Sequence, residues 1–410
     1  MTGTLSGLRV VDLSRILAGP ACTQILGDLG ADIIKIERPG DGDDTRKWGP
    51  PYLKDAAGQD TTESAYYLSC NRNKRSVAID ITQAEGQALI HALLEKSDIL
   101  IENFKVGGLK KYGLDYESVK ARHPHIIYAS ITGFGQTGPL ASEPGYDIMT
   151  QAIGGLMAAT GEVDGAPMKV GVALSDVMTG LYTAIGILAA LHKRTETGAG
   201  DHVDVALLDC TMASMTNLAQ YFLTSGTPAP RQGNAHSTIV PYQAFEAADG
   251  WVIVAVGNDT QFARFAKLLG HAEWSSGEKF ALNRNRVLHR DVLVPLIVAL
   301  MKQQTVAHWV TALQDIDVPA GPVNRMDQVF AMEQAQARGM EIEMQHAATP
   351  APIHLVGSPL KFNESPVEYR LPPPLCGADT MAVLQELLGK NNDDIQTLIK
   401  SGIIQTESAA

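Results

Sequence analysis

The first 210 residues alternate between short β-branched segments and apolar helical segments, and this alternation restricts the fold more than any other feature. Residues 8–13 and 32–37 are typical of strands, and the helix expected between them has Pro20 in its first turn and Gly30 near its end. Together these elements make a βαβ unit of about 30 residues. Such a unit joins two parallel strands through a helix.

The same pattern continues along the chain. Further strands are expected at 98–102, 125–130 and 202–207, and further helices at 82–96, 116–122, 177–194 and 208–222. Alternation of this kind predicts an α/β fold, with a parallel sheet that carries helices on both faces.

Two segments rich in Pro and Gly, 224–230 and 318–322, enclose a second region. Within it, strands are expected at 242–247 and 251–256, and helices at 261–269, 291–302 and 306–314. A last helix is expected at 380–388. The chain is long enough for more than one domain, and these two segments are the predicted boundaries.

Composition excludes several classes of function. The net charge of −12 argues against nucleic-acid binding, and neither a GxGxxG nor a P-loop motif is present. No apolar run of about 18 residues and no leader-like start are apparent, so no membrane segment and a cytoplasmic location are expected. The four cysteines are too widely spaced for a zinc site or a disulfide framework, and we expect reduced thiols.

Metal binding has little support, and no metal site is predicted. His123 and His125 form the closest histidine pair, but the proline between them favours a surface turn. The basic residues around Arg72 and Lys111 are typical of solvated faces unless an anion binds there. Basic residues are more frequent in the first 125 residues, so a polyanionic ligand is expected to bind in that part of the chain.

Two segments could carry chemistry. The turn at Ala18–Pro20 leads into a helix, and it is either a simple tight turn or a place where a phosphate meets the helix N-terminus. Asp176 begins a long apolar helix, where it is either a helix N-cap or a nucleophile. The residues alone leave both questions open.

Several motifs taken together resemble the class III CoA-transferases, the family of formyl-CoA transferase and the carnitine CoA-transferases. The segments that carry the resemblance are 15–20, 33–40, 42–46, 73–76 with Asp80, 102–104, 130–135, Asp176 with Thr179–Gly180, and 194–200. Their order and spacing match the family over nearly the whole chain.

The resemblance implies that Asp176 is the nucleophile. In this mechanism its carboxylate attacks an acyl-CoA, and the reaction passes through an aspartyl anhydride and an aspartyl-CoA thioester. Coenzyme A is then a carrier substrate, and no tightly bound cofactor is expected. Water must be excluded from both intermediates.

The resemblance also implies a set of binding residues. Those expected to contact coenzyme A are Arg15, Ile16, Leu17, Ala18, Arg38, Ile79, Asn103, Phe104, Lys105 and Lys111. Those expected near the acyl pocket are Trp48 and Tyr146. A shielding loop of the family corresponds to Gly257 and Asn258, although this chain has a single glycine there.

The family fold implied by the resemblance is an interlocked homodimer. Each chain has a Rossmann-like large domain built from both chain ends, 1–224 and 321–410, and a smaller α+β domain at 225–320. In the second half, a finer resemblance to the succinyl-CoA:glutarate branch of the family is carried by the segments 233–236, 239–245, 257–262 and 319–324. This resemblance implies succinyl-CoA as donor and a dicarboxylate as acceptor. A second carboxylate needs a cation, for which Arg46 and Arg72 are the candidates.

Two alternatives remain. An acyl-CoA racemase of the same fold needs a histidine within a Gly-His-Asp triplet, where this chain has Gly145-Tyr146-Asp147. A non-catalytic CoA-binding protein would have no use for a nucleophile at Asp176.

Overall fold

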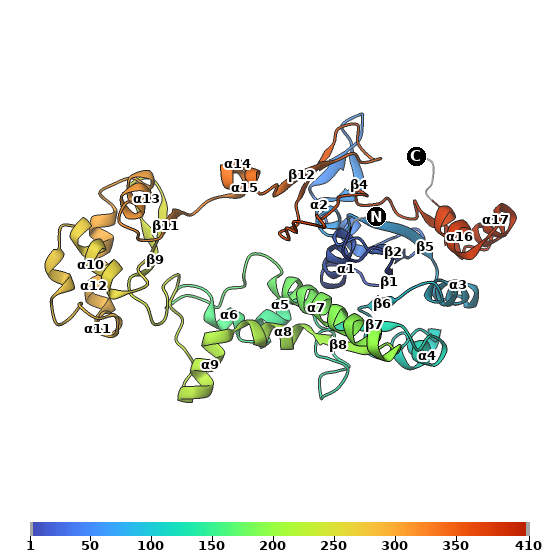
Figure 1. Ribbon diagram of the computed structural model, residues 1–410, viewed down its shortest axis with the longest axis horizontal. Coiled ribbons are helices and arrows are strands. Elements are labelled where there is room, and N and C mark those ends of the chain that lie inside the picture. The colour runs from blue at the N-terminus through green and yellow to red at the C-terminus, as the bar shows by residue number, and fades with distance from the viewer. Residues whose placement is uncertain (1–2, 407–410) are drawn as a thin grey trace. The chain divides into compact units, whose positions relative to one another are not determined.

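The computed structural model describes residues 3–406 and divides into two compact units (Figure 1). Unit 1 combines the chain up to Gly154, the segment Gly171–Met215 and the chain from Gln334 onward. Unit 2 combines Gly155–Val170 and Thr216–Glu333. The domain boundaries expected from the two linkers stay a prediction.

Unit 1 is built on a seven-stranded sheet in the order β14-β5-β2-β1-β6-β7-β8. Its strands are β1 (Arg9–Asp12), β2 (Asp32–Glu37), β5 (Lys74–Ile79), β6 (Ile99–Glu102), β7 (Ile127–Thr132), β8 (His202–Ala206) and β14 (Ile404–Gln405). The first six are parallel, and β14 pairs antiparallel with β5. The parallel strands follow the order third, second, first, fourth, fifth, sixth, as in doubly wound nucleotide-binding folds. The predicted α/β class with a parallel central sheet is confirmed.

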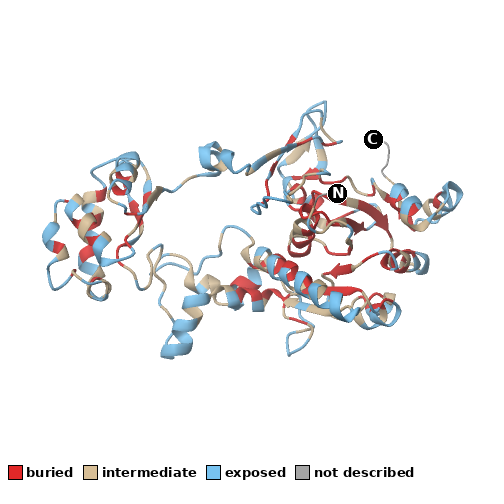
Figure 2. Ribbon diagram, viewed as in Figure 1, coloured by how far each residue is buried: buried red, intermediate tan, exposed pale blue. Residues whose placement is uncertain are grey.

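The two faces of this sheet support two separate cores. Val10 belongs to a cluster with Ile33 and Ile99, whereas its neighbour Val11 belongs to another cluster with Ile34 and Leu100, because successive side chains point to opposite faces. Buried segments follow the sheet strands in Figure 2. Helices on the Val10 face are α1 (Ala18–Asp28), α7 (Leu174–Thr197) and α8 (Leu207–Ser214). Those on the Val11 face are α3 (Ala84–Leu94), α4 (Tyr116–Arg122), α16 (Thr380–Leu388) and α17 (Asn392–Lys400).

Helix α7 corrects one expectation about apolar length. It has 24 residues, and its most apolar 18-residue window has a mean hydropathy of 1.5, which is enough by length and composition alone to cross a membrane. In unit 1 it packs against α1 and α8, and Ala184 and Ile187 enter the core. The predicted helix 208–222 is divided into α8 and α9 (Thr216–Ser225), because Thr216 has a φ of +36°.

The basic residues around β5 correct a second expectation. Arg72 and Lys74 are buried rather than solvated. The ammonium group of Lys74 donates hydrogen bonds to the carbonyl of Pro20 and the side-chain oxygen of Asn71, both at 2.9 Å. The stretch from Lys74 onward forms an interior strand of the sheet, so its polar side chains are satisfied by neighbouring backbone rather than by water.

Unit 2 has a three-stranded antiparallel sheet in the order β11-β10-β9. Its elements are β9 (Tyr242–Glu246), β10 (Trp251–Ala255), β11 (Ala320–Pro322), α6 (Leu156–Ala159), α9, α10 (Asp259–Leu268), α11 (Asn283–Leu288), α12 (Arg290–Met301), α13 (Val306–Gln314) and α14 (Met326–Ala331). Phe245, Phe262 and Trp309 belong to its core.

Short elements complete the chain. They are β3 (Tyr52–Lys54), β4 (Asp60–Ser64), α2 (Ala65–Leu68), α5 (Asp147–Ile153), α15 (Glu333–Ala337), β12 (Glu341–Met344), β13 (Ile353–Val356) and the 3₁₀ turns η1 (Asp44–Lys47), η2 (Lys110–Tyr112) and η3 (Ala272–Ser275).

Candidate active site

A cavity of about 440 Å³ opens in unit 1 where the strand order reverses. The chain following β1 contributes Arg15–Ala18, and the chain following the adjacent strand β6 contributes Asn103–Val106. The end of β7 contributes Ile131–Gly133. In doubly wound sheets ligands bind at this reversal, beyond the carboxyl ends of the strands. The cavity therefore lies where the topology favours a binding site.

Asp176 lines this cavity from the first turn of α7. The residue at the N-cap position of α7 is Ala173, which makes no side-chain capping bond. Capping comes from Asp147 at the start of α5: its Oδ1 accepts the N–H of Ser175 at 2.9 Å and that of Asp176 at 3.3 Å. The N-cap interpretation of Asp176 is therefore wrong, because a different carboxylate does that work.

The Asp176 carboxyl group is electrostatically perturbed. Burial, and then the nearby Asp147 carboxylate, raise its pKa from 3.8 to about 7. A carboxyl group in this state is more basic than an ordinary aspartate once it loses its proton. Raised pKa values of this kind gather at reactive carboxylates, which makes Asp176 the strongest candidate for chemistry in the cavity.

Close backbone packing brings the cavity walls together. A Cβ added to Gly180 would lie 2.7 Å from the carbonyl oxygen of Ala18, so α7 approaches the start of α1 one turn after Asp176. Likewise a Cβ on Gly145 would lie 2.2 Å from the Cα of Gly133. Neither contact leaves room for a side chain. The first holds α7, which carries Asp176, against the chain after β1, and the second holds the chain before α5 against the end of β7.

A second cavity of about 270 Å³ shares Arg15, Phe104 and Tyr112 with the first. It is lined otherwise by Leu13, Ile36, Glu37, Arg38, Ile79, Asp80, Ile81 and Thr82. Apolar and aromatic walls with a few polar groups suit a flat heterocycle. The two cavities together can hold an elongated ligand.

Cationic side chains line both cavities and indicate that the ligand is an anion. Arg15, Lys105 and Lys111 line the first cavity, and Arg38 lines the second. The Arg15 Nη1 pairs with Asp44 at 2.7 Å, while its Nε is one of two buried side-chain nitrogens without a hydrogen-bond partner in residues 3–406. These groups favour an anion. Among the same residues no cluster of His, Cys, Asp and Glu could hold a metal ion.

The structure brings most of the expected ligand residues together. The first cavity is lined by Arg15, Ile16, Leu17, Ala18, Asn103, Phe104, Lys105, Lys111, Tyr146 and Asp176, and the second by Arg15, Arg38, Ile79 and Phe104. Asn103 also fixes the backbone of Arg15. Its side-chain oxygen accepts the N–H of Arg15 at 3.0 Å, and its side-chain nitrogen donates to the Arg15 carbonyl at 2.7 Å.

Arg46 and Arg72 do not reach either cavity. Arg46 is 4% exposed, forms ion pairs with Glu37 and Glu63 at 2.8 Å, and lies 3.7 Å above the ring of Tyr67. Arg72 is paired with Asp28 at 2.6 Å. Their donors are occupied by ion pairs within the fold, so a role for either one in binding a second substrate carboxylate stays a prediction without a contact to either cavity.

The remaining expected residues lie elsewhere. Trp48 is exposed and makes an edge contact with the ring of Tyr66, 5.2 Å between centroids. Gly257 and Asn258 belong to unit 2, where Asn258 caps α10 by accepting the N–H of Gln261. Their part in shielding a reaction stays a prediction.

Two residues of the site were missed by the sequence analysis. Asp147 was seen only as part of a triplet without histidine, and no local signal could have shown its role, because it caps α7 and not its own helix α5. Tyr66 carries no motif; burial, and then the charge of Asp176, raise the pKa of its phenol to about 12. Only the three-dimensional structure indicates that Tyr66 lies near Asp176.

The chain matches a known family over most of its length. The family described as CoA-transferase family III matches residues 5–380. A succinate–glutarate CoA-transferase of Agrobacterium fabrum is 45% identical over 383 residues, covering 93% of this chain and 95% of its own. The human succinyl-CoA:glutarate CoA-transferase is 40% identical, covering 98% of this chain and 90% of its own.

Solved structures show the same architecture. A CAIB/BAIF family protein from Brucella suis superposes with a TM-score of 0.84 at 46% identity, over 94% of this chain and all of that one. Rv3272 from Mycobacterium tuberculosis superposes with a TM-score of 0.80 at 26% identity, covering 92% of this chain and 98% of its own.

Proposed function

The chain belongs to CoA-transferase family III, and we propose that it moves coenzyme A from succinyl-CoA to a dicarboxylate such as glutarate, with Asp176 as nucleophile. One observation carries this proposal above the others. The Asp176 carboxylate and the basic turn Arg15–Ala18 line a single cavity at the reversal of the strand order. The substrate assignment is supported by the names of the relatives at 40–45% identity.

The proposed reaction has two mirrored halves. The Asp176 carboxylate attacks the thioester carbonyl of succinyl-CoA, and the C–S bond breaks, which expels coenzyme A as a thiolate and leaves a mixed anhydride of Asp176 and succinate. The thiolate then attacks the aspartyl carbonyl, which releases succinate and forms an aspartyl-CoA thioester. The acceptor carboxylate attacks that thioester and expels the thiolate, which leaves a second mixed anhydride between the acceptor and Asp176. The thiolate then attacks the acceptor carbonyl of this anhydride, which gives the new acyl-CoA and frees the Asp176 carboxylate.

The surroundings of Asp176 favour its attack as a nucleophile and stabilise the charge that this attack creates. Burial makes the carboxylate a better nucleophile than an exposed aspartate, because ionisation leaves it poorly solvated. Ala18, the first residue of α1, lines the same cavity, and the N–H groups of Ala18 and Gly19 have no acceptors within their own helix. A helix N-terminus there would stabilise the negative charge that develops on the attacked carbonyl oxygen.

Coenzyme A is proposed to span both cavities. The adenine would occupy the second cavity between Ile79 and Phe104, and Arg38 and Arg15 would meet the phosphates. The pantetheine arm would pass Asn103 toward Asp176. No protein-bound cofactor takes part in this scheme, because coenzyme A is itself the carried group.

We also propose that the enzyme is an interlocked homodimer in the cytoplasm. Helix α7 leaves apolar side chains uncovered in the single chain: Val177, Leu181, Ile185 and Leu188 are 37–61% exposed. An apolar surface of this kind marks a contact with another molecule, and a second copy of the chain would cover it. Light scattering on the purified protein tests this; a monomer would contradict it.

Racemisation is the weaker alternative. Of the described residues that line the Asp176 cavity, none is a histidine, and Tyr146 takes the place that a racemase gives to its second base. The test is hydrogen exchange at the α-carbon of an acyl-CoA in deuterated water, without acceptor acid. The transfer proposal expects no exchange there, and rapid exchange would favour the racemase.

The transfer itself is tested with purified protein and succinyl-CoA. Glutarate, malate, itaconate, oxalate and carnitine are added separately, and new acyl-CoA is followed by mass spectrometry. We expect glutaryl-CoA or another dicarboxylyl-CoA to form. Product from carnitine alone would contradict the dicarboxylate assignment, and no product from any acid would favour a non-catalytic CoA-binding protein.

A further inference from the structure

Ile16 has a backbone conformation that its side chain disfavours. Its φ is +73°, in the left-handed region that β-branched residues rarely adopt. A conformation of this kind costs free energy and persists only where neighbouring contacts fix it. Ile16 lines the Asp176 cavity directly before α1, so the shape of the cavity depends on whatever holds this residue.

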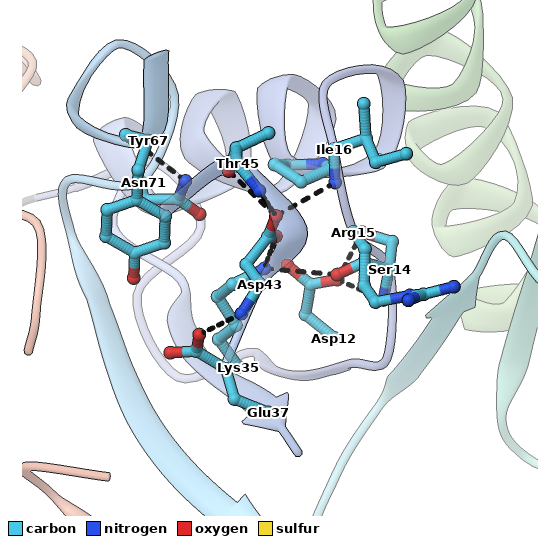
Figure 3. Close-up of polar contacts among 12 residues, drawn as sticks. Asp12, Ser14, Arg15, Ile16, Lys35, Glu37, Asp43, Thr45, Tyr67 and Asn71 are labelled. Carbon is cyan, nitrogen blue, oxygen red and sulfur yellow. Dashed lines mark hydrogen bonds and ion pairs between the residues drawn. The ribbon is translucent and has the colours of Figure 1, made fainter. Parts of the chain in front are cut away.

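Hydrogen bonds hold the backbone turn that leads up to the strained residue (Figure 3). The N–H of Ile16 donates to Oδ1 of Asp43 at 3.3 Å. The ammonium group of Lys35 donates to the carbonyl of Ser14 at 3.1 Å. These two contacts begin and end a three-residue span, and both come from one pair of side chains.

Lys35 and Asp43 form that pair as a buried ion pair. Nζ of Lys35 lies 2.8 Å from Oδ2 of Asp43, and both side chains are 0% exposed. Thr45 donates to Oδ1 of the same carboxylate through its N–H at 3.0 Å and its hydroxyl at 2.7 Å. Burial opposes the charge on Asp43, but Lys35 and the hydrogen bonds from Thr45 together outweigh burial and lower the pKa of Asp43 to about 2. The carboxylate therefore stays charged and fixed.

We propose that Lys35 and Asp43 are positioning residues for acyl-CoA binding: their ion pair grips the Ser14 carbonyl and the Ile16 N–H and so holds Ile16 in its left-handed conformation. Neither side chain lines the cavity, so both act through the turn and not on the substrate. This inference rests on the proposed function of the cavity as the coenzyme A site.

The competing explanation is that the pair only stabilises the fold. Replacing a buried ion pair by apolar residues of similar volume is often neutral for stability, so the two explanations can be separated. The informative variant is Lys35→Met/Asp43→Leu, which removes both charges together. Thr45→Val is the matched control, because it removes a hydrogen bond to the same carboxylate oxygen without touching the Ser14–Ile16 turn.

The experiment measures the Kd for coenzyme A by calorimetry, the KM for succinyl-CoA, kcat and the melting temperature. Lys35→Met/Asp43→Leu is expected to raise Kd and KM about tenfold with kcat changed by less than about threefold. Thr45→Val should leave Kd and KM unchanged. The decisive arm repeats the pair replacement in an Ile16→Gly background, where left-handed φ carries no steric penalty. There the loss in affinity should shrink below about threefold.

The outcomes separate this inference from the function on which it rests. Equal losses of affinity in the Ile16 and Ile16→Gly backgrounds, or unchanged affinity after the pair replacement, would overturn the positioning role. A fall in melting temperature without a change in Kd would assign the pair to stability alone. If the wild-type protein fails to bind coenzyme A at all, the proposed function fails first, and that result is visible before any variant is made.

Discussion

The side chain of Asp147 accepts the backbone N–H of Asp176, and its negative charge also disfavours ionisation of the Asp176 carboxylate. One residue thus fixes the first turn of α7 and tunes the group that this turn presents to the cavity. This geometry links the helix start directly to the chemistry proposed for the enzyme.

The pH dependence of the first half-reaction should follow Asp176. Only the carboxylate attacks, so the rate of acyl transfer from succinyl-CoA should rise with pH through a midpoint near the pKa of about 7. Asp147→Asn removes the like charge and keeps an oxygen for the helix N–H groups, so the midpoint should move to lower pH. Asp209→Asn, an exposed carboxylate on α8, is the control. Rapid-quench rates between pH 5 and 9 check this, and an unmoved midpoint in Asp147→Asn would contradict it.

Ionisation of Asp176 should lower the free energy of unfolding, although the same ionisation is needed for activity. The raised pKa means that the folded protein holds this proton more tightly than the unfolded chain, so the ionised form destabilises the fold as pH rises from about 4 to about 7. Asp176→Asn should therefore be inactive yet more stable than wild type by about 1–3 kcal/mol at pH 8, with a smaller difference at pH 5. Denaturant unfolding at both pH values measures this. A variant less stable than wild type at pH 8 would count against the desolvated carboxylate.

The close approach of α7 to α1 should make Gly180 intolerant of a side chain. Gly180→Ala places Cβ against the backbone carbonyl of Ala18, so we expect a loss of about 1–3 kcal/mol despite the better helix propensity of alanine. Activity should fall as well, because the shift separates Asp176 from the Arg15–Ala18 turn. Gly321→Ala in β11 is the control, since its Cβ would enter open space. Equal stability of the two variants would show that the helices can separate freely.

The second cavity should determine affinity for coenzyme A. Arg38→Ala should raise the KM for succinyl-CoA about tenfold with little change in kcat, and high salt should reduce the difference from wild type. Lys47→Ala is a matched control, because Lys47 and Arg38 both pair with Asp41 but only Arg38 lines the cavity. Steady-state kinetics at two salt concentrations test this. Equal effects of both substitutions would indicate that Asp41, and not the ligand, is the relevant partner.

The periodicity of the sequence predicted much of unit 1. Strand β2 and helix α4 lie where the sequence pattern places them: β2 buries its three isoleucines, and α4 packs on the core through Val119. Strand β5 was missed because Lys74 and Arg75 begin it, and their burial depends on partners such as Pro20 and Asp32 that are distant in sequence. Charged residues are assigned to surfaces by default, and only tertiary contacts reverse that assignment.

The candidate site was predictable from motifs but not from the residues alone. An aspartate at a helix start is more often a cap, and the structure shows that Asp147 takes this role in place of Asp176. Arg46 and Arg72 show a second limit of sequence reasoning: an arginine next to a family motif can bind a ligand or form a buried ion pair. Here ion pairs with Glu37 and Asp28 occupy them. Sequence spacing carries no information on that choice.

The central claim is that Asp176 carries coenzyme A during the exchange, and trapping the intermediate tests it most directly. The protein is incubated with succinyl-CoA, quenched rapidly and digested, and the peptide containing Asp176 is examined by mass spectrometry with and without hydroxylamine. We expect a coenzyme A adduct on Asp176 that hydroxylamine converts to a hydroxamate, and exchange reduced on the order of 10⁴-fold or more in Asp176→Asn. Full exchange activity in that variant, or an adduct on a different residue, would contradict the account.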